Sequence, residues 1–245
     1  MIQILRANAS RSFTQGPFTL RRIRPGSIMG PDADPAFGPL SVIDHANLDV
    51  GTVVGLHEHK NDEILSYLWR GSMVHIDSAR GRVPISAKKL MLMNAGRSFW
   101  HEESTPYVAV EMLQIFVRPY EADLPGKVQF FDRTGGLVPG GWQLIAGPEG
   151  TDAPLLLRQH VKVYDALVSK GDELRVPTAP GMDPWLYVMD GALTIDGEQL
   201  ETGDAAATSG EDLPMIRVER DETTLLAFLV DRGATASTAG TISGQ

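Results

Sequence analysis

Short apolar segments interrupted by turn residues run through almost the whole chain of 245 residues. Many are rich in Val, Ile, Tyr or Phe, and glycine, proline, aspartate or asparagine separates them at intervals of about 8 to 14 residues. No segment keeps a helical stripe for three turns, and even LLLRQHVKVYDALV alternates like a strand around Val161 and Val163. This pattern is typical of β-sandwiches and barrels, so the sequence predicts an all-β fold.

The second half of the chain repeats the pattern of the first half. EILSYLWRGSMVHID and PWLYVMDGALTIDG each contain a hydrophobic strand, a turn that ends in glycine (Gly71 or Gly191), and a second strand. Two hairpins of this kind predict two tandem small barrels. We expect the first barrel in residues 1–134 and the second in residues 135–232, because a stretch rich in glycine and proline separates them. Residues 233–245 are small and polar and are expected to be disordered, or pinned by a partner.

Composition excludes several classes of function. The formal net charge of −9 disfavours nucleic acid and anionic lipid as primary partners, because phosphate binding needs a basic surface. The chain has no cysteine, so any metal must be held by His, Asp or Glu. The N-terminus lacks the long apolar region of a signal peptide, and no apolar run approaches the roughly 18 residues needed to span a membrane. These features predict a cytoplasmic protein without membrane contact.

Three of the six histidines lie in two short acidic motifs, HEHKNDE beginning at His57 and HEE beginning at His101. In a strand, residues i and i+2 point to the same side. His57 and His59 therefore share one face, and His101 and Glu103 share another, with the intervening glutamate of each motif pointing away. If the two strands are neighbours, they supply three imidazoles and one carboxylate to one point.

Such a ligand set suits a divalent transition metal, for example Fe(II), Mn(II), Ni(II), Cu(II), Co(II) or Zn(II). An octahedral ion with four protein ligands keeps two positions open for a substrate and for O₂ or water. The alternative is an acidic surface patch without a metal, since the chain has 31 acidic residues and HxH on a strand occurs in many proteins that bind no metal. We expect the remaining histidines, His45, His75 and His160, to be surface residues or hydrogen-bonded structural residues.

An apolar lining is expected below the polar cluster. Extending the face of His57 past the motif places Glu63, Leu65, Tyr67 and Trp69 on the same side. Ordinary core packing is the alternative explanation for the large aromatic side chains of this stretch.

Several motifs resemble those of the pirin family within the cupin superfamily. GTVVGLHEHKNDE (residues 51–63) is similar to the first cupin motif, and MNAGRSFWHEES (residues 93–104) is similar to the MxAGxGxxHSE segment of pirins. GPLSVIDH and LQIFV resemble further family segments, and VMDGALTIDG resembles the second, metal-free cupin of bacterial pirin-like proteins. The resemblances extend over most of residues 20–230, although the residues around the histidines depart from the usual pirin pattern.

The resemblance implies a bicupin whose N-terminal barrel binds one metal, usually Fe(II), through His57, His59, His101 and Glu103. In many other cupins the glutamate at the position of Glu63 is itself a ligand. The pirin pattern instead implies Glu103 as the ligand and Glu63 as a nearby residue that acts as an acid or base.

Two functions follow from the resemblance. The first is that of a quercetin 2,3-dioxygenase, an oxidoreductase that opens a flavonol ring with O₂, with Glu103 or Glu63 taking the flavonol proton. An apolar lining that includes Phe99 and Trp100 would suit such a small aromatic substrate. The alternative is a non-catalytic metal-binding regulatory protein that binds a transcription factor or a metabolic enzyme, for which the acidic charge favours a protein partner over direct contact with DNA.

Overall fold

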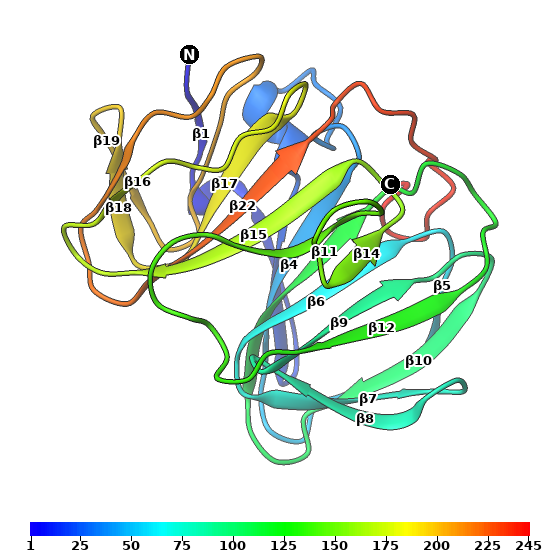
Figure 1. The fold of residues 1–245 in the computed structure, drawn as a ribbon. Coiled ribbons are helices and arrows are strands. Elements are labelled where there is room, and N and C mark those ends of the chain that lie inside the picture. Colours follow the sequence, from blue (N-terminus) through cyan, green and yellow to red (C-terminus); the bar gives the residue numbers. More distant parts are fainter.

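The protein consists of two β-barrels packed against each other (Figure 1), and this computed structural model describes residues 1–245. Two short 3₁₀ helices, η1 (Ala7–Ala9) and η2 (Pro25–Met29), are the only helices, and no helix is long and apolar enough to cross a lipid bilayer. The predicted all-β fold with two tandem barrels is confirmed.

The first barrel is built from one 11-stranded sheet. Its strands are β2 (Arg11–Gln15), β3 (Phe18–Ile23), β4 (Leu40–Leu48), β5 (Val53–His59), β6 (Glu63–Arg70), β7 (Ser72–Asp77), β8 (Gly81–Ser86), β9 (Lys89–Asn94), β10 (Phe99–Ser104), β11 (Val110–Val117) and β12 (Lys127–Asp132). They follow the order β2-β3-β4-β11-β6-β9-β8-β7-β10-β5, with β12 paired to β9.

The second barrel contains a seven-stranded and a four-stranded sheet. The larger sheet has the order β1 (Gln3–Leu5), β20 (Ala205–Ala207), β17 (Asp183–Asp190), β22 (Thr223–Val230), β15 (Val161–Val168), β13 (Gln143–Pro148) and β14 (Leu155–Leu157). The smaller sheet has the order β16 (Glu173–Leu174), β21 (Ile216–Val218), β18 (Ala192–Ile195) and β19 (Glu198–Glu201).

The central strands of both barrels are buried on both faces. In β6, Ile64 and Leu68 pack inside the first barrel, whereas Leu65 and Tyr67 belong to the apolar cluster shared with the second barrel. The second barrel contributes residues such as Trp185 to this shared cluster. Strands enclosed on both sides read as continuous apolar runs instead of alternating ones, which explains segments such as EILSYLW and TTLLAFLV. The shared cluster fixes the two barrels as one body.

A buried polar group also joins the barrels. The Tyr67 hydroxyl donates to Asp165 Oδ2 at 3.1 Å, and Arg133 Nη1 donates to the same oxygen at 2.6 Å. The Asp165 side chain has no exposed surface and the Arg133 side chain is 6% exposed, so the charges compensate each other inside the protein.

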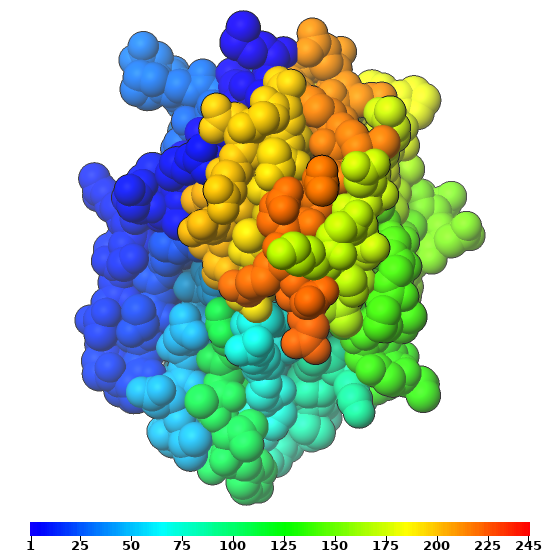
Figure 2. Space-filling view, turned by 90° about the vertical axis from the view of Figure 1, so that its left-hand side faces the viewer, coloured from blue at the N-terminus to red at the C-terminus, as the bar shows by residue number.

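Both ends of the chain cross to the other barrel. The N-terminal strand β1 pairs with β20 in the register Gln3↔Ala207, and Figure 2 shows the N-terminal residues (blue) beside those of the second barrel (yellow and orange). The chain passes between the two main sheets after β12, where the predicted division at residue 134 falls. The domain boundaries stay a prediction, because the crossing ends make the division incomplete.

The predicted disorder of residues 233–245 is wrong. This segment returns to the first barrel, where Ser243 is fully buried and its carbonyl oxygen accepts hydrogen bonds from Ser41 Oγ and Arg118 Nε. Small polar residues suggested disorder because they bury little apolar surface, but here backbone hydrogen bonds to buried partners hold the segment.

Candidate metal centre

The two histidine motifs lie on neighbouring strands. Strand β10 pairs antiparallel with β5, which places His101 directly opposite His57. The ring centroids are 4.3 Å apart for His57 and His101, 5.2 Å for His59 and His101, and 5.0 Å for His57 and His59. A register shift follows, so that Glu103 lies opposite Val54, one residue further along β5 than regular pairing would give. This is the signature of a β-bulge, a device that re-aims side chains at functional sites.

The first two histidines have one ring nitrogen occupied. His57 Nδ1 lies 2.8 Å from the carbonyl oxygen of Gly55, and His59 Nδ1 lies 3.1 Å from Asp62 Oδ2. Because both partners are acceptors, each Nδ1 carries the hydrogen and donates it, and each Nε2 keeps a free lone pair. A hydrogen bond of this kind fixes the tautomer and orientation of a metal-binding imidazole.

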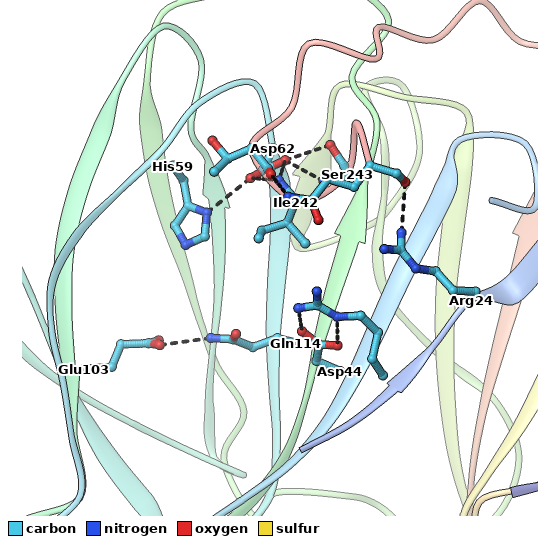
Figure 3. Close-up of polar contacts among 11 residues, drawn as sticks. Arg24, Asp44, His59, Asp62, Glu103, Gln114, Ile242 and Ser243 are labelled. Atoms are coloured by element: carbon cyan, nitrogen blue, oxygen red, sulfur yellow. Dashed lines mark hydrogen bonds and ion pairs between the residues drawn. The ribbon is translucent and has the colours of Figure 1, made fainter. Parts of the chain in front are cut away.

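His101 and Glu103 each contain a buried polar atom that lacks a partner. His101 Nε2 and Glu103 Oε1 are buried without a hydrogen bond. The other carboxylate oxygen, Glu103 Oε2, accepts from Gln114 Nε2 at 2.9 Å (Figure 3). Buried nitrogen and oxygen atoms are rarely left unpaired, and an imidazole nitrogen beside a carboxylate oxygen is a donor set that transition metals prefer. The residues present therefore fit a divalent metal.

Burial sets the protonation of these groups. Desolvation, supported by the nearby imidazoles of His57, His59 and His75, lowers the pKa of His101 to about 2, so its ring is neutral as a ligand must be. Desolvation raises the pKa of Glu103 to about 7, against the opposing effects of His59 and Gln114. A cation in the site would favour the charged carboxylate and remove this penalty.

The structure divides the predicted ligands between two overlapping groups. His57, His59 and His101 offer ligand atoms within 4.8 Å of one another, and so do His75, His101 and Glu103. His101 thus joins both groups, and Glu103 is close enough for the charge of His59 to affect its pKa. That these four predicted residues bind a metal stays a prediction.

His75 was not predicted near the site. It lies on β7 opposite Glu103, its Nδ1 is 3.3 Å from His101 Nδ1, and its Nε2 is 2.7 Å from Asp77 Oδ2. It is the hydrogen-bonded residue that we expected. The pairing of β7 with β10 brings His75 to the site, and the local sequence around His75 carries no signal for that pairing.

Glu63 lies away from the histidines. Its Oε2 accepts hydrogen bonds from Asn94 Nδ2 and from the backbone N–H of Arg158, 2.9 Å away, in the direction of the second barrel. Glu63 is buried, and this burial raises its pKa to about 7. These contacts hold the carboxylate between β6, β9 and the second barrel, so a role as acid or base stays a prediction.

The expected lining by Leu65, Tyr67 and Trp69 is wrong. Asn61 adopts a positive φ of 52° in the turn that ends β5, and the chain begins a separate strand at Glu63. The alternation therefore restarts, and the odd-numbered residues of β6 face the second barrel instead of the cavity.

Phe99 and Trp100 also lie outside the cavity. Phe99 packs on the first-barrel core, and Trp100 is 49% exposed.

A cavity of about 200 Å³ adjoins His57, His59 and Glu103. Its apolar wall comes mainly from Phe18, Leu20, Val54, Met112, Phe116 and Ile242. Polar groups are few: besides Gln114, Arg22 and Asp44 form a two-point ion pair, with Nε–Oδ1 at 2.8 Å and Nη2–Oδ2 at 2.7 Å. An apolar cavity with a few fixed polar groups is typical of a small-molecule site.

Comparisons with known proteins agree with this arrangement. The family model described as pirin matches residues 27–117, and the model described as the quercetinase C-terminal cupin domain matches residues 144–229. The chain is 28% identical over 192 residues to a quercetin 2,3-dioxygenase of Escherichia coli strain K12. This alignment covers 78% of this chain and 82% of that protein.

Solved structures give the same result. The crystal structure of the bacterial pirin YhhW from Escherichia coli, in complex with nickel(II), is similar with a TM-score of 0.83 and 25% identity, over 94% of this chain and 99% of that chain. A quercetin 2,3-dioxygenase from Acinetobacter baumannii shares the fold, with a TM-score of 0.73 and 22% identity over 91% of this chain and 84% of that chain. Two family models that together match more than half of the chain, and this likeness along nearly its full length, show that the chain belongs to the pirin family and is a bicupin.

Proposed function

We propose that the first barrel binds one divalent transition metal through His57, His59, His101 and Glu103, with Fe(II) as the native ion. The unpaired His101 Nε2 and Glu103 Oε1 beside the apolar cavity carry this proposal. Nickel(II) in the similar Escherichia coli pirin supports a transition metal and makes nickel a useful probe. Mn, Cu, Co and Zn share the preference for such ligands, so elemental analysis of protein purified without added metal tests the choice of iron.

The proposed reaction is the oxidative ring opening of a flavonol-type aromatic substrate by O₂. The relatives that carry the name quercetin 2,3-dioxygenase support this substrate class. When bound, the metal supplies a Lewis acid that lowers the pKa of the flavonol 3-hydroxyl. A cavity of about 200 Å³ is smaller than the roughly 300–1,000 Å³ of sites that enclose a drug-sized ligand, so the flavonol enters with one end only.

The residues of the chain divide the remaining tasks. Glu103 Oε1 is the ligand atom, so the hydroxyl proton goes to Oε2, which keeps a free lone pair beside the hydrogen bond from Gln114 Nε2 that fixes the direction of the carboxylate. The apolar walls exclude water from the reacting end of the substrate. The paired Arg22 and Asp44 offer the polar contact at the cavity that orients a phenolic hydroxyl.

Aerobic incubation of the metal-loaded protein with quercetin tests the proposal. We expect the flavonol absorbance to fall and a ring-opened product to appear by mass spectrometry. His101→Ala should abolish both signals, whereas His160→Ala changes an exposed histidine outside the site and should leave them unchanged. A metal-loaded wild-type protein that leaves quercetin intact would reject this activity and favour the regulatory alternative.

A further inference from the structure

The last seven residues of the chain lie against the candidate metal centre. The segment 239–245, here called the C-terminal strap, runs past the turn between β5 and β6. Lys60 and Thr241 exchange two hydrogen bonds: Lys60 N donates to the side-chain Oγ1 of Thr241 at 2.7 Å, and Thr241 N donates to the Lys60 carbonyl oxygen at 2.9 Å. The strap therefore binds the chain directly after His59.

Asp62 is the residue that the strap holds most firmly. The backbone N–H and the hydroxyl of Ser243 donate to Asp62 Oδ1 at 2.9 and 2.7 Å, and the N–H of Ile242 donates to Asp62 Oδ2 at 3.2 Å. Asp62 Oδ2 in turn accepts from His59 Nδ1 (Figure 3). Asp62 has no exposed surface, so these bonds are formed away from water, where hydrogen bonds to a charged group are strong. A continuous chain of contacts thus connects Ser243 to the His59 ring.

The strap is anchored on its other side as well. The Ser243 carbonyl oxygen accepts from Ser41 Oγ at 2.6 Å and from Arg118 Nε at 2.8 Å, and Arg24 Nη1 donates to the Gln245 carbonyl oxygen at 2.9 Å. Three residues of the first barrel therefore fix the strap from the side opposite Asp62.

Ile242 joins the strap to the cavity. Its side chain packs on the small apolar cluster that contains Ile64 and Phe116, and it lines the same cavity as His57, His59 and Glu103. The two neighbours in the strap thus act on different parts of the site: Ser243 on Asp62 behind His59, and Ile242 on the space for substrate.

We infer that the C-terminal strap is part of the N-terminal site, in which Asp62 and Ser243 are positioning residues for His59 and Ile242 determines specificity as a wall of the cavity. The inference rests on the proposed metal centre and deepens it. Residues that orient a ligand from behind typically change metal affinity about 10- to 100-fold when they are lost. The C-terminal strap lies outside both histidine motifs, and it then controls both the affinity for metal and the fit of the substrate.

Gly240 gives a precise way to dislodge the strap. A Cβ at this position would overlap Ser243 Oγ and lie 2.5 Å from Asp62 Oδ1, so Gly240→Ala must push these groups apart. Gly233→Ala is the matched control in the same tail, because its Cβ would meet only Asp231 Oδ1 at the ordinary distance of 3.5 Å.

Nickel(II) titration by calorimetry on the full-length protein tests the positioning role. We expect the nickel dissociation constant to rise about tenfold in Gly240→Ala and to stay within about twofold of wild type in Gly233→Ala. Ser243→Ala, which deletes only the hydroxyl donor to Asp62, should raise it about threefold and carries the test if Gly240→Ala does not fold. A merely structural strap would lower the melting temperature of the metal-free protein without changing nickel affinity, and that result would overturn the inference.

Quercetin binding to the nickel-loaded protein tests the wall. Ile242→Ala keeps the backbone donor to Asp62, so nickel affinity should be unchanged while the quercetin dissociation constant rises about fivefold. Ile2→Ala, an equal truncation of a partly buried residue on the second barrel, should change neither value. Unchanged quercetin affinity in Ile242→Ala would refute the role in specificity. Wild-type protein that binds no nickel would instead refute the metal centre itself, so the two failures are distinguishable.

Discussion

Replacing Glu63 with glutamine is expected to raise the free energy of unfolding relative to wild type as the pH increases above about 4.5. Burial raises the pKa of the Glu63 carboxyl group from its ordinary 4.5 to about 7. Between these values the folded protein holds a proton that the unfolded chain has released, so the free energy of unfolding of the wild type falls as the pH rises. The stabilisation is fully present below about 4.5 and is lost by about pH 7. The difference between the two pKa values corresponds to roughly 3 kcal/mol.

Glutamine is well suited to this test. Both donors to Glu63, the Asn94 amide and the backbone N–H of Arg158, bind the same oxygen, Oε2. A glutamine carbonyl oxygen in that place accepts both hydrogen bonds, and the side chain carries no charge to bury. We therefore expect the variant to gain roughly 3 kcal/mol relative to wild type between pH 4.5 and pH 8.

Urea unfolding, followed by tryptophan fluorescence in the presence of a chelator, measures this difference at several pH values. Glu121→Gln alters an exposed glutamate and should leave the difference from wild type constant with pH. A constant difference between wild type and Glu63→Gln would refute the reasoning. The same variant also tests the predicted acid or base role of Glu63, because a structural residue leaves nickel binding and quercetin turnover within about twofold, whereas loss of turnover with metal retained would support that role.

Three further substitutions test the site and the fold. His101→Ala should abolish stoichiometric nickel binding in calorimetry while circular dichroism still shows the folded barrels; full metal occupancy in this variant would exclude His101 as a ligand. Arg133→Met leaves Asp165 buried without its cation and should reduce the free energy of unfolding by about 3–5 kcal/mol, measured in urea at neutral pH, and a loss below 1 kcal/mol would contradict the buried pair. Gly71 has a positive φ of 81°, and a Cβ added there would overlap the backbone carbonyl oxygen of Ala109. Gly51 has a similar φ of 85°, but its Cβ would point into open space, so Gly71→Ala should destabilise the protein by about 2 kcal/mol more than Gly51→Ala. Equal melting temperatures of the two variants would contradict this.

The ligand motifs could be predicted because they depend on local periodicity. Alternation along a strand places His57 beside His59 and His101 beside Glu103, whatever the rest of the chain does. The antiparallel pairing of β5 and β10 then brings the two motifs together, as expected for neighbouring strands of a barrel.

The wrong prediction of a lining by Leu65, Tyr67 and Trp69 extended a local pattern across a turn. The face of His59 was continued to Leu65 and Tyr67, but the turn at Asn61 ends one strand, and the next strand has its own alternation. The position of His75 depends in a similar way on the pairing of β7 with β10, which links residues that the sequence separates.

The all-β class, the two similar halves and the types of side chain that can bind a metal follow from the sequence, because turn residues, alternation and composition act over a few residues. The neighbours of those side chains depend instead on how distant segments pack together. Asp62 contacts Ser243 from the far end of the chain, and Glu63 turns toward Arg158 of the second barrel. Such contacts arise from packing between distant segments, and a small polar tail carries no local signal that distinguishes a disordered segment from one held by buried hydrogen bonds.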